Sequence, residues 1–138
     1  MEIKDKSFKE LETLSQEIRD RIIDVVSRKG GHFSSTLGAV ELTLGMHYVF
    51  DVYSDPFIFD VSHQCYPHKL LTGRWEEFET VRQFGGLSGF TKPNESPADY
   101  FVAGHSSTSI SLAVGAAKAI SLKKENRVPV VMIGDGSM

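Results

Sequence analysis

The stretch Val128-Pro129-Val130-Val131-Met132-Ile133-Gly134-Asp135-Gly136-Ser137 decides the fold class. Its apolar run, rich in β-branched residues, predicts a short and fully buried β-strand. The strand ends at Gly-Asp-Gly, so a carboxylate lies at the carboxyl end of a buried strand, where open α/β sheets bind ligands. The flanking glycines let the backbone approach a bulky group such as a phosphate. Because the sequence stops at Met138, we expect the chain to be the front part of a larger protein, ending inside its own site.

The composition is that of a globular protein with room for one domain or a piece of one. The 138 residues are 41% apolar and 24% charged, and the net charge of -3 provides no basic surface for nucleic acid. The polar N-terminus is not a targeting peptide, and no apolar run approaches the roughly 20 residues that span a bilayer. Cys65 is the single cysteine and has no internal disulfide partner, which favours a reducing compartment. We therefore predict a cytoplasmic protein that binds neither nucleic acid nor membrane.

Helical and strand patterns alternate along the chain, which predicts an α/β fold with a parallel sheet flanked by helices. The first helix is expected to begin at Ser7 or Thr13, since both have capping-box spacing, and to end at Gly30-Gly31. Its apolar stripe consists of Leu11, Leu14, Ile18, Ile22 and Val25. Further helices are predicted over residues 37–50, 67–71, 75–81 and 110–123.

Two of these helices have a distinctive composition. Residues 37–50 are apolar on nearly all sides, which predicts a helix buried on most faces. Small residues in 110–123 predict close contact with the sheet. Strands are predicted over 57–61, 100–102 and 130–133, and 85–99 is the longest irregular segment.

Three histidines lie in loops or directly after strands: His32, His63 and His105. Because parallel strands end at one edge of a sheet, His63, His105 and Asp135 are expected to face one crevice, with His32 joining from its loop. Imidazole can transfer protons near neutral pH. One such histidine alone is more often a capping or core residue, but three in these positions favour a functional role. His47 and His68 are interpreted as structural.

Two further features suggest an anion and a metal. Residues 106–109 (Ser-Ser-Thr-Ser) start a predicted helix, where amides and hydroxyls either bind an anion or simply cap the helix. Asp135 could hold Mg²⁺ against a diphosphate, since Mg²⁺ usually takes one or two carboxylates together with phosphate oxygens. The absence of a P-loop and of a Gly-x-Gly-x-x-Gly motif disfavours nucleoside triphosphates and nicotinamide cofactors. Cys65 as a nucleophile beside His63 is a weaker alternative.

Five blocks carry a resemblance to a known family. They are GGHFSSTLGAVEL (residues 30–42), FDVSHQCYPHKLLTG (59–73), RQFGGLSGFTK (82–92), GHSSTSISLAVG (104–115) and VVMIGDGSM (130–138). In their order and spacing they resemble the 1-deoxy-D-xylulose-5-phosphate synthase family, from about Leu14 to Met138. The chain departs from the usual pattern in small ways, with Ser34 and Ser62 where glycine is common, Thr36 for asparagine and Ser137 for alanine.

The resemblance implies a transferase that uses thiamine diphosphate and Mg²⁺. It would join a two-carbon unit from pyruvate to D-glyceraldehyde 3-phosphate with loss of CO₂, for isoprenoid (terpenoid) and thiamine biosynthesis, as a homodimer. His32 and His63 would be catalytic and Asp135 would ligate the metal. The expected cofactor contacts are His63, Gly104, His105, Ser106, Gly136 and Ser137. Residues 1–138 would be the N-terminal portion of the thiamine diphosphate-binding, transketolase-like domain, and inactive alone, because the family's second metal ligand and its activating glutamate are missing.

Three alternatives stay open at this point. The chain could belong to another thiamine diphosphate enzyme, such as transketolase or a 2-oxoacid dehydrogenase component, although Asp60-Val61-Ser62-His63-Gln64 together with Gly104-His105-Ser106-Ser107-Thr108 disfavours this. It could be a complete, non-catalytic binding module. It could also be a remnant without function, whose unpaired sheet edge would promote aggregation.

Overall fold

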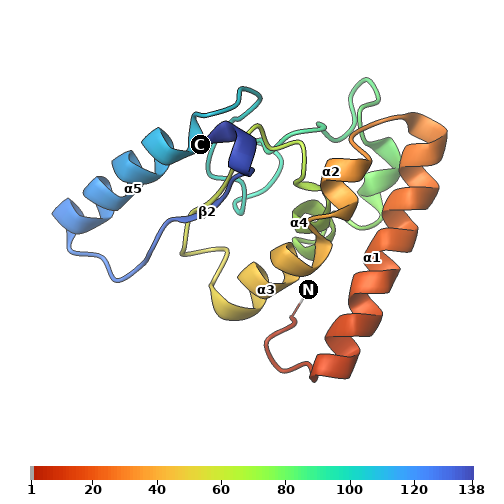
Figure 1. Ribbon diagram of the computed structural model, residues 1–138, viewed down its shortest axis with the longest axis horizontal. Helices are drawn as coiled ribbons and strands as arrows, with labels where there is room; N and C mark the ends of the chain where they lie inside the picture. The colour runs from red at the N-terminus through yellow and green to blue at the C-terminus, as the bar shows by residue number, and fades with distance from the viewer. Residues whose placement is uncertain (1) are drawn as a thin grey trace. The chain divides into compact units, whose positions relative to one another are not determined.

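The computed structural model describes residues 2–138, which fold into helices and one small parallel sheet (Figure 1). The predicted α/β class with a parallel sheet is confirmed. The described residues form two compact units, one made of the segment up to Phe50 with His63–Gly89 and the other of Asp51–Ser62 with Phe90–Met138. In chain order the elements are α1 (Phe8–Lys29), α2 (Ser34–Leu37), α3 (Val40–Val49), β1 (Phe57–Phe59), α4 (Tyr66–Leu71), η1 (Glu77–Thr80), α5 (Ser109–Lys123), β2 (Val130–Met132) and η2 (Asp135–Ser137).

Helix α1 begins at the first of the two predicted capping boxes. The Ser7 hydroxyl accepts a hydrogen bond from the Glu10 amide, and the Glu10 carboxylate accepts one from the Ser7 amide at 2.8 Å. The helix ends at Gly30, whose φ of 79° lies in the region that favours glycine. Four of the five predicted stripe residues, Leu14, Ile18, Ile22 and Val25, are buried. Local sequence therefore defines this helix, and its apolar face packs on α3 and α4.

The helix predicted over 37–50 forms as α3, with a later start at Val40. Leu37 ends the separate short helix α2, and between the two helices the Ala39 amide donates to the Thr36 carbonyl in a tighter i to i−3 bond. The predicted burial is wrong, since Leu42 is 60% exposed and Val49 is 66% exposed. The buried face of α3 includes His47, whose Nε2 lies 3.1 Å from Nδ1 of the fully buried His68 in α4. This geometry agrees with the structural interpretation of these two histidines.

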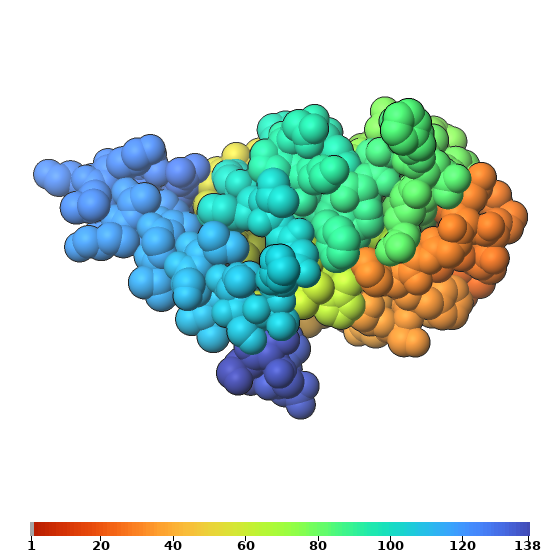
Figure 2. All heavy atoms as spheres, turned by 90° about the horizontal axis from the view of Figure 1, so that it is seen from above, coloured from red at the N-terminus to blue at the C-terminus, as the bar shows by residue number. Residues whose placement is uncertain are grey.

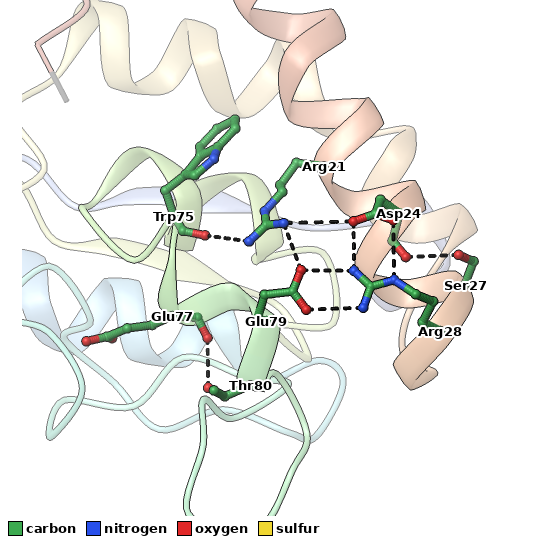
Figure 3. Close-up of polar contacts among 8 residues, drawn as sticks. All are labelled: Arg21, Asp24, Ser27, Arg28, Trp75, Glu77, Glu79 and Thr80. Atoms are coloured by element: carbon green, nitrogen blue, oxygen red, sulfur yellow. Dashed lines mark hydrogen bonds and ion pairs between the residues drawn. The ribbon is translucent and has the colours of Figure 1, made fainter.

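The predicted helix over 75–81 is also wrong, because only the short 3-10 turn η1 forms there. Its Glu79 carboxylate contacts two arginines of α1, with Arg21 and Arg28 each donating to Glu79 Oε1 at 2.9 Å (Figure 3). Arg21 also donates to the carbonyl of Trp75 at 3.2 Å. Val81 has an extended backbone and ends the turn before Gly85-Gly86. Long-range ion pairs to α1 thus accompany a tighter turn than the apolar spacing predicts.

In the second unit, β1 and β2 pair in parallel with Phe57 opposite Val130 and Phe59 opposite Met132. All of β1 is buried, but Val130 and Val131 are half-buried, so the prediction of a fully buried strand at 130–133 is wrong. The reason is that β2 has one neighbouring strand, β1, within the described residues. A strand this weakly enclosed keeps part of its side-chain surface in contact with water.

Two other predictions for this unit need correction. No strand forms over 100–102, because the Phe101 carbonyl accepts from the Thr91 hydroxyl at 3.0 Å and Val102 is 71% exposed. Helix α5 contacts both strands, as expected, but a Cβ added at Gly115 would meet no atom within 4 Å. The small residues of α5 therefore do not all pack closely against a neighbour. The buried apolar residue of this helix is Ile120. No helix in the described part of the chain has the length and apolar character needed to cross a bilayer.

Candidate functional site

In the first unit, the structure brings together two of the three predicted histidines. The His32 and His63 ring centroids lie 5.7 Å apart in an edge-to-face arrangement. His32 comes from the loop between α1 and α2, and its amide donates to the Tyr66 hydroxyl at 3.4 Å. The carbonyl of His63 accepts a hydrogen bond from the Thr36 hydroxyl at 3.0 Å. Helices α2 and α4 thus fix the backbones that carry the two imidazoles.

The surroundings of His32 favour its uncharged form. Burial first, and then the positive charge of Arg82 and the ring of His63, hold the pKa of His32 below its ordinary value. Neutral imidazole has one nitrogen that can accept a proton and one that can donate a hydrogen bond. The Nδ1 atom of His63 is buried and has no hydrogen-bond partner within residues 2–138. An unsatisfied buried nitrogen of this kind is a ready contact for a polar group of a ligand.

In the second unit, the Gly134-Asp135-Gly136 segment follows β2 and turns into η2. Asp135 is exposed, and its Oδ1 accepts from the Gly136 amide at 2.9 Å. A Cβ added at Gly134 or Gly136 would meet no atom within 4 Å, so the backbone there is open to a large group. No cluster of three or more His, Cys, Asp or Glu side chains that could hold a metal occurs in the described chain. Asp135 is therefore a single carboxylate, which suits Mg²⁺ only if phosphate oxygens and water supply the other ligands.

The segment with Gly104, His105 and Ser106 is exposed and lies beside a hollow of 660 Å³ in the second unit. The residues that line this hollow include Gly104, His105, Thr108 and Leu112. Figures 1 and 2 both show η2 next to the segment that leads into α5. A larger hollow of 680 Å³ in the first unit, between α1 and α3, is lined by Phe8, Leu44 and Tyr48 among others, and none of the predicted site residues lines it.

The amides at the start of α5 are already hydrogen-bonded within the protein. Those of Ser107 and Ser109 donate to the buried carboxylate of Asp60, at 3.0 and 3.2 Å. The sequence predicts that residues 106–109 bind an anion or cap the helix. For the Ser107 and Ser109 amides the outcome is capping, and the capping group belongs to Asp60, which is distant in the sequence. Asp60 and Tyr66 are residues near the site that are not among the predicted site residues. The signal for Asp60 was an acid set between Phe59 and Val61, at the end of a strand.

The predicted site residues are thus divided between the units. His32 and His63 lie together in the first, whereas Gly104, His105, Ser106, Asp135, Gly136 and Ser137 lie in the second. The meeting of both groups at one sheet edge stays a prediction.

Polar residues that follow the strands of a parallel sheet, next to glycines with open backbone, define the class of α/β proteins that bind ligands at strand ends. Comparison with known proteins specifies the family. The family profile for 1-deoxy-D-xylulose-5-phosphate synthase matches residues 1–138, and the chain belongs to this family. The family resemblance of the sequence is thereby confirmed.

Curated relatives with the same name match the whole chain. The chain is 89% identical to the 1-deoxy-D-xylulose-5-phosphate synthase of Aliarcobacter butzleri over 138 residues, which are 23% of that relative. The corresponding protein of Nitratiruptor sp. is 75% identical and that of Campylobacter hominis 70% identical, each over the whole chain and 23% of the relative. The chain thus spans about a quarter of the length of the relatives it matches.

Proposed function

We propose that this chain forms the N-terminal part of a thiamine diphosphate-dependent 1-deoxy-D-xylulose-5-phosphate synthase. The reaction joins the two-carbon unit of pyruvate to D-glyceraldehyde 3-phosphate and releases CO₂. The observation that carries the proposal is the family match over the whole chain. The full-length synthase would be a protein of the relatives' length that contains these residues. The 138 residues alone are expected to be inactive.

The residues of the structure fit the proposed cofactor. Backbone that is open at Gly104, Gly134 and Gly136 leaves room for a diphosphate. Asp135 supplies one carboxylate for a Mg²⁺ ion that also binds phosphate oxygens. The Nδ1 of His63, buried and without a hydrogen-bond partner among the described residues, offers a polar contact for the cofactor. His105 and Ser106 add polar side chains beside the hollow that Gly104 and His105 line.

When bound, thiamine diphosphate supplies the electron sink that breaks the carbon–carbon bond of a 2-oxoacid. The protein residues would bind, orient and exchange protons. Burial lowers the pKa of His32, which favours the neutral imidazole, and a neutral imidazole could accept a proton from a substrate hydroxyl and return it later. His63, whose ring lies next to that of His32, would contact the cofactor. Gly136 and Ser137 would line the diphosphate, with Asp135 holding the metal.

The proposal includes a homodimer in the cytoplasm. The runner-up is another thiamine diphosphate enzyme such as transketolase, which would use a keto-sugar phosphate as the two-carbon donor. Assay of the full-length synthase with each donor separates the two: product from pyruvate and D-glyceraldehyde 3-phosphate supports our proposal. Turnover of a keto-sugar phosphate, with none of pyruvate, would overturn it.

A binding experiment tests the metal site. We expect Asp135→Ala in the full-length synthase to abolish Mg²⁺-dependent binding of thiamine diphosphate in calorimetry, because the cofactor phosphates would lose the cation that links them to the protein. Asp20→Ala is the matched control, since Asp20 is an exposed aspartate of α1 whose carboxylate only accepts from Gln16. Unchanged affinity in Asp135→Ala would refute the assignment of Asp135 as the metal ligand.

A further inference from the structure

Asp60 is a buried acid whose backbone is held by the sheet. It directly follows β1, is 2% exposed, and donates its amide hydrogen to the carbonyl of Met132 at 2.8 Å. This bond continues the pairing of β1 with β2 by one residue. The sheet therefore fixes the backbone of Asp60, and the side chain is shielded from water.

The Asp60 carboxylate accepts hydrogen bonds from Ser107, just before α5, and from Ser109, the first residue of α5. Its Oδ1 accepts from the Ser107 amide at 3.0 Å, and its Oδ2 accepts from the Ser109 amide at 3.2 Å and from the Ser109 hydroxyl at 2.7 Å. Thr108, the N-cap residue of α5, forms no side-chain capping bond. Asp60 thus supplies from the sheet the cap that the helix lacks locally, and an anion is favoured at this helix end.

The charged state of Asp60 is stabilised by these donors. Burial opposes ionisation, but the hydrogen bonds from Ser109 and Ser107 outweigh it and hold the pKa of Asp60 below its ordinary value. The side chain of Ser137 in η2 acts in the same direction. The carboxylate accepts its hydrogen bonds from Ser107 and Ser109, so its main structural effect is at the start of α5.

The segment that Asp60 holds has a costly backbone shape. Ser107 has a φ of 63°, in the left-handed region that is unfavourable for residues other than glycine. Such a conformation persists only where the surroundings enforce it. The hydrogen bond from Ser107 to Asp60 is a contact that does so, and Ser107 comes directly after Gly104-His105-Ser106.

We infer that Asp60 is a positioning residue that shapes the cofactor-binding segment Gly104–Ser106 without touching the cofactor itself. The inference rests on the proposed function. The ionised carboxylate takes up the amides of Ser107 and Ser109, so the diphosphate would bind at the glycine backbone on either side. Loss of the carboxylate frees the strained turn at Ser107 and lets the Gly104–Ser106 segment before it move.

The test uses the full-length synthase with Asp60→Asn, which keeps the volume but replaces one acceptor oxygen with a donor. We expect the calorimetric Kd for thiamine diphosphate with Mg²⁺ to rise about 10- to 100-fold, since a hydrogen bond to a charged group is lost. The KM for the cofactor should rise in parallel, while kcat at saturating cofactor stays within about 3-fold. Without cofactor, amide hydrogen exchange should speed up in residues 104–109 and stay unchanged in α1.

Two further variants make the result specific. Asp99→Asn is the matched control: Asp99 lies in the same unit, is also 2% exposed and accepts from the Lys92 amide at 2.9 Å. We expect its cofactor Kd to stay within about 2-fold of the wild type. Ser109→Ala removes only the hydroxyl bond to Asp60 and should raise the Kd by about 3- to 10-fold.

The outcomes separate this inference from the proposed function. An Asp60→Asn protein with unchanged Kd, or with unchanged exchange in residues 104–109, overturns the positioning role. If Asp60→Asn does not fold, Ser109→Ala decides, and an unchanged Kd in that variant overturns the role. If the wild type itself does not bind thiamine diphosphate, the proposed function fails.

Discussion

Acid is expected to weaken the first unit through His47, whose ring meets that of His68 in the core. The two rings share one hydrogen bond, which requires at least one imidazole nitrogen without a proton. Burial, and then the ring of His68, lower the pKa of His47 to about 3, from an ordinary value of 6.5. An unfolded chain therefore takes up a proton at His47 well before the folded chain does.

The size of the effect follows from this difference in proton uptake. Stability is complete above pH 6.5 and is lost progressively as the pH falls from 6.5 toward 3. Each pH unit in this window costs about 1.4 kcal/mol, so lowering the pH from 7.5 to 5.0 should remove about 2 kcal/mol through His47 alone. In urea this corresponds to a midpoint lower by about 1 M.

The assay is urea unfolding of the purified chain at pH 7.5 and 5.0, followed by circular dichroism. His47→Gln keeps a polar partner for His68 but does not titrate, so its pH dependence should be smaller than that of the wild type by about 2 kcal/mol. His105→Gln is the control, since His105 is exposed, and should show the full wild-type dependence. Equal losses in the wild type and His47→Gln would refute the reasoning, as would an NMR titration of the folded His47 ring between pH 5 and 7.

Two further predictions concern the backbone around the site. In Gly31→Ala the new Cβ would meet the Tyr66 hydroxyl at 2.8 Å, whereas in Gly30→Ala it would meet nothing within 4 Å, although both glycines have positive φ. Gly31→Ala should therefore be less stable than Gly30→Ala by about 1–3 kcal/mol in urea unfolding and should shift the His32 NMR signals; equal stability would contradict this. Ser62 has a φ of 74° but exchanges hydrogen bonds with Thr91, so Ser62→Gly relieves strain and yet should lose about 1 kcal/mol on balance. Ser62→Ala, which loses the bonds and keeps the strain, should be less stable still, and a Ser62→Gly protein more stable than the wild type would show that the bonds contribute little.

The parts of the fold that could be predicted are those specified by near neighbours in the sequence. The start of α1 follows from Ser7 and Glu10, three residues apart, and its stop from Gly30. The helix expected through Trp75 forms as a 3-10 turn, and its Glu79 contacts arginines more than 50 residues away, which the local apolar spacing does not indicate. The strand expected at 100–102 fails because an apolar triplet does not specify a neighbouring strand.

The candidate site likewise contains residues that could be predicted from their neighbours in the sequence and one that could not. His32 and His63 could be selected because each stands in a loop context that the sequence displays directly. Asp60 could not, since its partners Ser107 and Ser109 lie 47 and 49 residues further on. Its role needs the fold, because the chain must return to β1 before the amides and the carboxylate meet.

The parallel pairing of β1 with β2 also affects how the chain folds during its synthesis. Phe57 pairs with Val130, so the strand that pairs with β1 in the described residues is made only after 73 more residues have been added. At roughly 5–20 residues per second, synthesis leaves Phe57-Ile58-Phe59 unpaired for about 4–15 s. During that time three bulky apolar residues, all buried in the finished fold, are open to other nascent chains. This short stretch is where we expect chaperones to be needed, and where faster translation would improve the yield of folded protein.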